Sequence, residues 1–399
     1  MEGRDGQPRV GLVLAGGGAR GAYEIGALSA LLPHLEERGE RPRILVGTSV
    51  GALNTAYLAA TAELSASEAC AHGEEIWRTT SFADVLRPLV SLRSVAGLAR
   101  YLGQLFGLVR TTPSALVDPS PLEPTLRRMI PFAQLHSNVE QGFVDTASVV
   151  ATSALTSRSV VFHHGGASPS RDDKRGIDYV AARLDAEHVR ASAAIPGVFP
   201  AVEVGSPEPA RGWYWDGGTR LNTPIKPVLA LGAERVVVIA LNSTATPPVG
   251  LAGESRPDIF AGMAQFLQAG LVDPLVEDVE TLAAVNVEVG EGDAGGAKKK
   301  VPYILIAPRE RESIGEIACR IFNENYRGFA KSLRRRDLAF LGRAVAGGAD
   351  SAHGELLSYL FFAPEFAEPL IELGREDARR WLGATHEDGP WKLGPVVRD

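Results

Sequence analysis

The feature that most constrains the fold is a short turn at residues 47–51, Gly-Thr-Ser-Val-Gly. The apolar residues 44–46 precede it and predict a buried strand, and residues 52–60 after it are compatible with a helix. A turn between a strand and a helix with this sequence forces the central serine into a strained backbone conformation and exposes its hydroxyl. The pattern therefore predicts Ser49 as a nucleophile at the end of a strand.

The two flanking glycines and the helix support this interpretation. Side chains at Gly47 and Gly51 would clash where the strand and the helix pass close to each other. The N-terminus of the following helix favours negative charge near the Ser49 oxygen. The alternative is that Gly-x-Ser-x-Gly occurs by chance, since the chain has 43 Gly residues.

The N-terminal region predicts a parallel α/β unit. The apolar run Arg9–Ala15 is expected to form a strand buried on both faces, a glycine-rich loop follows at Gly16–Gly21, and a helix is expected from about Ala22 to Leu35. The second strand, Arg43–Thr48, leads into the serine turn. This order of elements is typical of a right-handed parallel unit.

The glycine-rich loop has two alternative interpretations. As an oxyanion loop, it presents bare backbone amides, chiefly those of Gly17 and Gly18, and Arg20 either adds charge or holds the loop by hydrogen bonds. Gly16, Gly18 and Gly21 also fit the Gly-x-Gly-x-x-Gly pattern of dinucleotide-binding proteins. That function requires an acidic residue at the end of the second strand, where this chain has the serine turn instead. We therefore favour the oxyanion loop.

A serine nucleophile needs a base, and the sequence favours an aspartate. None of the eight histidines follows a predicted strand in a strong motif; they are His34, His72, His136, His163, His164, His188, His353 and His386. Asp216 follows the aromatic strand Trp213–Trp215 and precedes Gly217 and Gly218, which allow close approach to its carboxylate. We expect the two tryptophans to raise its pKa, although one faces away. Asp-Gly-Gly is also a strong signal for a plain turn.

Composition excludes several classes of protein. The net charge of −7 argues against nucleic-acid binding, which needs an excess of Lys and Arg. The two cysteines, Cys70 and Cys319, are far apart, so we expect neither a disulfide framework nor a zinc site. We see no signal peptide and no apolar run long enough to span a membrane, and we expect a cytoplasmic protein.

Two segments are less specific. Phe82–Leu116 is apolar with interspersed arginines, which predicts one or two amphipathic helices. These helices are either a lid or an element that contacts a lipid surface, or they are ordinary helices packed on the core with solvated arginines. From Ser313 onward the pattern is helical. We expect a catalytic α/β domain over residues 8–310 and a C-terminal helical segment over residues 311–399, packed on it or following it.

Three motifs occur in one order: GGGARG at Gly16–Gly21, GTSVG around Ser49, and DGG at Asp216, with the serine and the aspartate 167 positions apart. Together with RASAAIPGVFPAV at Arg190–Val202 and VDPSPLEPTL from Val117, they resemble the patatin-like phospholipases. The resemblance covers roughly residues 10–227. It implies a three-layer α/β/α fold with a central, mostly parallel sheet.

The resemblance also implies a function. Ser49 is expected to be the nucleophile, Asp216 the base, and the loop of Gly16, Gly17, Gly18, Ala19, Arg20 and Gly21 the oxyanion site. The implied activity is lipid ester hydrolysis through an acyl-serine, without a metal or cofactor, on a lipid or membrane-surface substrate. The alternatives are acyl transfer by the same dyad and a catalytically silent lipid-binding protein.

Overall fold

The computed structural model describes residues 7–88, 117–245, 300–326 and 351–395, with a few positions between 262 and 286. The strands of its main sheet are β1 (Val10–Leu14), β2 (Ile44–Thr48), β5 (Thr146–Ser153), β6 (Ser159–His164), β7 (Ile177–Ala181), β8 (Val202–Val204), β9 (Gly212–Asp216), β10 (Arg235–Ile239) and β11 (Tyr303–Ile306). Their order is β11-β10-β1-β2-β5-β6-β7, and β9 pairs with both β5 and β8. The pairs from β11 to β5 are parallel, and β6 and β9 run antiparallel to β5.

The described helices are α1 (Gly21–Glu37), α2 (Val50–Ala60), α3 (Ala66–Thr79), α4 (Phe82–Val85), α6 (Leu122–Met129), α7 (Phe132–Gln141), α8 (Ala186–Ser192), α9 (Ile225–Ala230), α12 (Ser313–Tyr326), α15 (Ser351–Leu360) and α16 (Pro364–Gly383). Short 3-10 turns occur at Gly18–Arg20, Glu208–Ala210 and Gly217–Thr219. A separate two-stranded ribbon pairs β3 (Arg87–Pro88) with β4 (Val117–Asp118).

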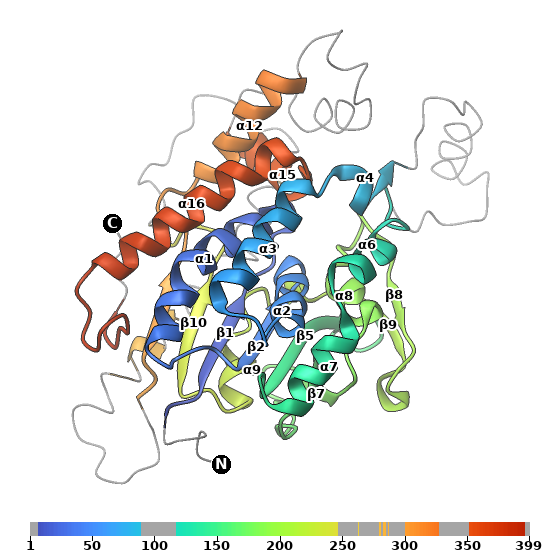
Figure 1. Ribbon diagram of the computed structural model, residues 1–399. Helices are drawn as coiled ribbons and strands as arrows, with labels where there is room; N and C mark the ends of the chain where they lie inside the picture. Colours follow the sequence, from blue (N-terminus) through green and yellow to red (C-terminus); the bar gives the residue numbers. More distant parts are fainter. Residues whose placement is uncertain are drawn as a thin grey trace.

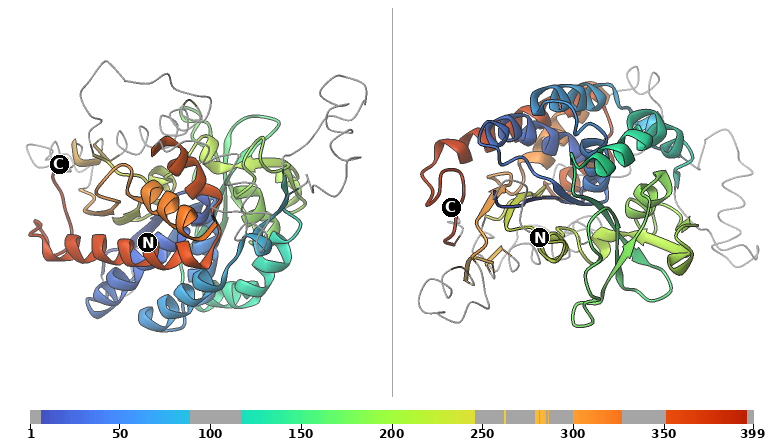
Figure 2. Two further views of the ribbon diagram at one scale, coloured as in Figure 1. Left: turned by 90° about the horizontal axis from the view of Figure 1, so that it is seen from above. Right: turned by 60° about the horizontal axis from the view of Figure 1, so that its bottom comes forward.

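Strand β1 shows why the fold has three layers. Successive side chains of a strand point to opposite faces, and all five residues of β1 are buried. Leu12 and Leu14 belong to the core beneath α1, α2 and α16, whereas Val13 belongs to a second core beneath α9. A central, mostly parallel sheet between two helical layers is therefore confirmed (Figures 1 and 2).

The register of β5 brings two strand ends together. β2 pairs with β5 up to Thr48, which lies opposite Val150. β9 pairs with the same edge of β5, from Tyr214 opposite Ser153 to Asp216 opposite Ala151. The other edge of β5 is occupied by β6. The chain leaving β2 and the chain leaving β9 therefore start from neighbouring positions, although they are far apart in the sequence.

The C-terminal helices pack on the α/β unit. Helix α16 crosses α1 at very close range: a Cβ at Gly26 would lie 2.0 Å from the carbonyl oxygen of Ile371, and a Cβ at Gly374 would lie 2.1 Å from that of Tyr23. The Tyr23 hydroxyl also donates to Asp377 at 2.8 Å. Figure 1 shows α16 running alongside α1, with α12 and α15 near its N-terminal end.

Two segments singled out in the sequence can be compared with the structure. The motif at Arg190–Val202 begins within helix α8, which starts at Ala186, where Asp185 caps its N-terminus, and ends at Ser192. Of the expected amphipathic stretch Phe82–Leu116, the structure describes α4 and β3, and residues 89–116 lie outside the described part. None of the described helices is long and apolar enough to cross a membrane.

Candidate active site

Ser49 lies at the sharp turn between β2 and α2. Its backbone has φ 55° and ψ −121°, and Ser49 and Ser157 are the two non-glycine residues of the described chain with positive φ. This conformation is costly for a residue with a Cβ and persists where the surroundings hold it. The Ser49 amide donates to the Ser192 Oγ at 2.9 Å, and the Ser192 hydroxyl donates to the Val150 carbonyl at 2.5 Å. Helix α8 thus fixes the turn to β5.

The two glycines of the turn are required by close backbone contacts. A Cβ at Gly47 would lie 2.1 Å from the Gly51 carbonyl oxygen. A Cβ at Gly51 would lie 2.3 Å from the Leu14 carbonyl oxygen. Real Cβ atoms do not approach oxygen so closely, so larger residues would push α2 away from the sheet.

Asp216 is the last residue of β9 and is buried beside Ser49. The Ser49 hydroxyl lies beside its carboxyl group, and the Gly218 amide donates to its Oδ1 at 2.7 Å. Burial raises the pKa of Asp216 from 3.8 to about 6, while the Ser49 hydroxyl and the Gly218 amide act in the opposite direction. A Cβ at Gly217 would lie 2.2 Å from the Val150 carbonyl oxygen, so glycine is needed where the chain leaves β9.

The expected role of the two tryptophans is wrong. Side chains alternate along β9, so Asp216 shares a face with Tyr214, and both Trp213 and Trp215 point to the other face. Trp213 is 56% exposed. The aspartate is desolvated instead by its place against β5, where it lies opposite Ala151.

The glycine-rich loop lies against the serine turn. A Cβ at Gly16 would be 3.1 Å from the Ser49 Cβ and 2.4 Å from the Asn222 Oδ1. The Gly16 amide donates to the Asn222 carbonyl at 3.2 Å, and the Asn222 side-chain amide donates to the Gly16 carbonyl at 3.3 Å. Asn222 therefore ties the loop to the segment that follows Asp216.

The next loop residues differ in what they face. Gly18 has φ 60° and lines the same pocket as Ser49. Within the described residues, the amides of Gly17 and Gly18 donate no hydrogen bond to the protein. Ala19 is buried in the core, and Gly21 packs against Val50 and Trp77. The first part of the loop thus has two amides that are free of acceptors within the described protein, and the second part packs tightly into the core.

Arg20 does not face this pocket. Its side chain is 1% exposed and forms an ion pair with Glu355 of α15, 2.6 Å between Nη2 and Oε2. Of the two roles considered for Arg20 from the sequence, this geometry supports holding the loop by hydrogen bonds.

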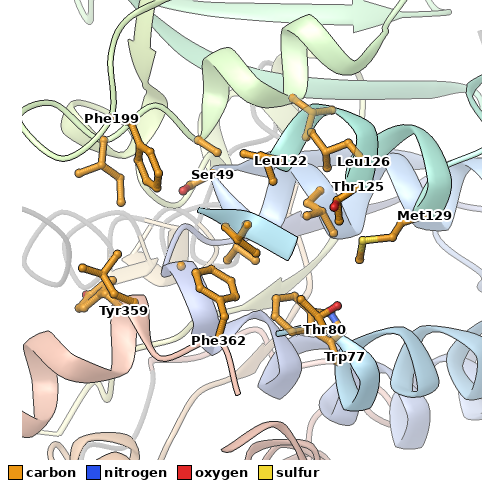
Figure 3. A pocket seen from close by; sticks show the side chains of 18 residues that line it. Ser49, Trp77, Thr80, Leu122, Thr125, Leu126, Met129, Phe199, Tyr359 and Phe362 are labelled. Atoms are coloured by element: carbon orange, nitrogen blue, oxygen red, sulfur yellow. The ribbon is translucent and has the colours of Figure 1, made fainter. Parts of the chain in front are cut away.

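An apolar pocket opens at Ser49 (Figure 3). Its walls come from α2, α3, α6, α8 and α15 and from neighbouring loops, and include Leu53, Trp77, Leu126, Met129, Phe199, Leu360 and Phe362. Figure 3 shows Phe199 and Leu122 on one side and Tyr359 and Phe362 on the other. This lining suits a hydrocarbon chain and leaves few polar partners for other ligands.

Metal ligands do not gather anywhere in the described part of the chain. Among these residues, no three His, Cys, Asp or Glu side chains are placed to hold an ion.

Some residues of the site were not assigned from the sequence. Ser192 lies within the Arg190–Val202 motif and Asn222 follows the Asp-Gly-Gly motif, so the motifs marked their neighbourhoods but not their roles. Tyr359 and Glu355 carry no motif. Their roles depend on the placement of α15 beside the loop, which residue patterns do not encode.

Comparison with known proteins then decides the family. The model of the patatin-like phospholipase family matches residues 12–229, more than half of the chain. The protein belongs to the patatin-like phospholipase family. Membership supports lipid acyl hydrolysis as the type of reaction.

More specific likenesses are weaker. The chain is 28% identical over 254 residues to uncharacterized NTE family proteins of Mycobacterium bovis and Mycobacterium tuberculosis, which covers 64% of this chain and 54% of each of those proteins. It thus spans about half the length of these relatives. VipD from Legionella pneumophila is 14% identical with a TM-score of 0.31, covering 77% of this chain and 64% of VipD, and at that score it adds no argument.

Proposed function

We propose that this patatin-like protein hydrolyses carboxylic esters of lipids through an acyl-Ser49 intermediate, with Asp216 as the base. The observation that carries the proposal is a Ser49 hydroxyl beside a buried aspartate at the opening of an apolar pocket. This pairing supports Ser49 as a nucleophile with Asp216 as its base. The pocket matches the acyl chain of a lipid rather than a polar substrate.

The proposed reaction has two steps. Asp216 accepts the Ser49 proton while the Ser49 oxygen attacks the ester carbonyl, and it then returns the proton to the leaving alcohol. Water, activated by the same carboxylate, cleaves the acyl-serine and releases a fatty acid. A raised pKa of about 6 suits both proton transfers near neutral pH.

The oxyanion of each tetrahedral intermediate needs hydrogen-bond donors. The amides of Gly17 and Gly18 are proposed for this role, because they have no acceptor within the described protein and Gly18 lines the pocket. The N-terminus of α2 adds a favourable field at Ser49. Loss of one such donor typically costs about 100- to 1000-fold in kcat.

The test is fatty-acid release from mixed phospholipid vesicles by the wild type and by Ser49→Ala. We expect release by the wild type and a loss of at least about 1000-fold in Ser49→Ala, since removing a nucleophile leaves little more than binding. Thermal unfolding checks that the variant is folded. Turnover retained in folded Ser49→Ala would contradict the assignment.

Two further measurements separate the alternatives that share this site. Product analysis with an added alcohol distinguishes acyl transfer, which yields a new ester, from hydrolysis. A serine-directed phosphonate that fails to label Ser49 in the wild type would support a catalytically silent lipid-binding protein.

A further inference from the structure

The side chain of Arg20 connects the glycine-rich loop to the C-terminal helix α15. Its Nε donates to the Ser358 Oγ at 2.8 Å, and its Nη2 donates to the Glu355 Oε2 at 2.6 Å and to the Glu355 carbonyl at 3.0 Å. The guanidinium carbon also lies 4.0 Å from the centre of the Tyr359 ring. The buried Arg20 side chain therefore makes four interactions with a single helix, α15.

The remaining donors of Arg20 point to the chain that leaves β10. Its Nη1 donates to the Asn242 Oδ1 at 2.9 Å and to the Leu241 carbonyl at 3.3 Å. A guanidinium has five N–H donors, and all five of Arg20 are thus used within the protein. No donor is left for a lipid phosphate, so we do not expect Arg20 to bind an anion.

The same two segments enclose the loop itself. A Cβ at Gly17 would lie 2.4 Å from the Leu241 Cδ1, and a Cβ at Gly18 would lie 2.1 Å from the Tyr359 carbonyl oxygen. The loop is therefore packed between the segment that follows β10 and helix α15. Any shift of α15 changes where these amides lie relative to Ser49.

We propose that Glu355, assisted by Ser358, is a positioning residue for ester hydrolysis: it fixes Arg20 and so holds the loop of Gly16–Gly21 at the oxyanion. The inference rests on the proposed function. Glu355 lies outside residues 12–229, which match the family model. The proposal therefore gives the C-terminal helical segment a role in the reaction.

The physical reason is the cost of an unpaired buried charge. Without Glu355, the Arg20 guanidinium would keep its charge in a buried site and would have to reorient or admit water. Either change moves the loop. A displacement of about 1 Å in a catalytic group can reduce the rate by about 100-fold.

The test compares Glu355→Ala with Glu74→Ala, a matched control. Both glutamates are buried, with 8% and 7% of their surface exposed. Glu74, on α3, also bonds an arginine of the C-terminal segment, with 2.5 Å between its Oε1 and the Arg375 Nη2. Within the described residues, its carboxylate accepts hydrogen bonds from Arg78 and Arg375 and none from the loop of residues 16–21. Loss of Glu74 therefore reports the general cost of weakening C-terminal packing.

We expect Glu355→Ala to lower kcat on a soluble short-chain ester by about 10-fold or more with KM within about 2-fold, the signature of an interaction made only in the transition state. Glu74→Ala is expected to keep kcat within about 2-fold. Glu355→Gln, which retains a hydrogen-bond acceptor, is expected to recover part of the loss. Hydrogen exchange at the amides of residues 17–21 is expected to be faster in Glu355→Ala only.

Opposite results would overturn the role. An unchanged kcat in folded Glu355→Ala, or an equal kcat loss and equal loop exchange in Glu74→Ala, would show a structural contact only. If Glu355→Ala does not fold, Glu355→Gln and Ser358→Ala carry the same test, with the same expected direction. A wild type that neither hydrolyses esters nor labels with a phosphonate would contradict the proposed function, and the positioning role with it.

Discussion

The proton balance of the site is set by one residue, Asp216. Burial raises its pKa to about 6, and its ionised form is the base of the proposed reaction. Protonation of Asp216 therefore removes the base. Activity is therefore expected to be lost as the pH falls through about 6 and to be retained above it.

We accordingly expect kcat/KM for a soluble ester to be constant above pH 7 and to fall about 10-fold per unit below pH 6. A pH profile of the wild type, with folding checked at each pH, measures this. Activity that stays constant down to pH 5 would mean that the base has an ordinary carboxyl pKa, contrary to the burial of Asp216.

A stability measurement gives a second check of the same pKa. Because the folded protein binds this proton more tightly than the unfolded chain, the carboxylate destabilises the fold above pH 6, and this cost disappears as the pH falls toward 4. Asp216→Asn should therefore raise the free energy of unfolding at pH 8 by on the order of 3 kcal/mol, for a shift of about two pKa units. Urea unfolding at pH 8 and pH 4 measures the difference.

Residue patterns predicted the turn at Ser49 because its determinants are local: a buried strand, two glycines and a helix. They did not predict the supporting bond from the Ser49 amide to Ser192, which joins residues 143 positions apart. The prediction that the tryptophans raise the pKa of Asp216 was wrong because Trp213 and Trp215 both lie on the face of β9 opposite Asp216. Periodicity assigns faces, but long-range partners require the fold.

At the level of elements, helices α1 and α16 pack against each other with their backbones in close contact. Helix α1 begins directly after Arg20, so its position fixes the end of the loop. The contact depends on Gly26 and Gly374, where added Cβ atoms would meet backbone oxygens rather than flexible side chains. Nothing in the helical pattern of the C-terminal segment distinguished Gly374 from other glycines.

We expect Gly374→Ala to lower the free energy of unfolding by about 1–3 kcal/mol, because the two backbones must separate. Gly383→Ala is the control on the same helix, since a Cβ there would meet nothing within 4 Å; it is expected to be neutral or slightly stabilising. Urea unfolding of the three proteins measures both changes. Equal stability of Gly374→Ala and the wild type would show that α16 adjusts freely on α1.

For the whole molecule, the sequence predicted the fold class and the turn that carries Ser49. It also predicted two parts, residues 8–310 and residues 311–399. We propose instead that the two parts form one folding unit. Phe361, Phe366, Leu370 and Ile371 of the C-terminal segment are each at most 1% exposed and belong to the core that contains α1 and α2. The division followed from helical composition, which does not show what a helix packs against.

A chain shortened to residues 1–310 should therefore fail to unfold cooperatively and should bind a dye for exposed apolar surface, because it would expose the face of α1 that α16 covers. A chain ending at residue 395 is the control. Circular dichroism melting and dye fluorescence distinguish the two. Cooperative melting of the shorter chain, together with phosphonate labelling of Ser49, would restore the two-part division.

The meeting of β2 and β9 on one edge of β5 has a consequence for variation among such proteins. Each strand is aligned against β5 independently, with Thr48 opposite Val150 and Asp216 opposite Ala151. The number of residues inserted or deleted between them does not enter that alignment. Loops between β2 and β9 that do not contact Ser49 or Asp216 can therefore change in length without altering how the Ser49 hydroxyl and the Asp216 carboxylate are aligned on β5.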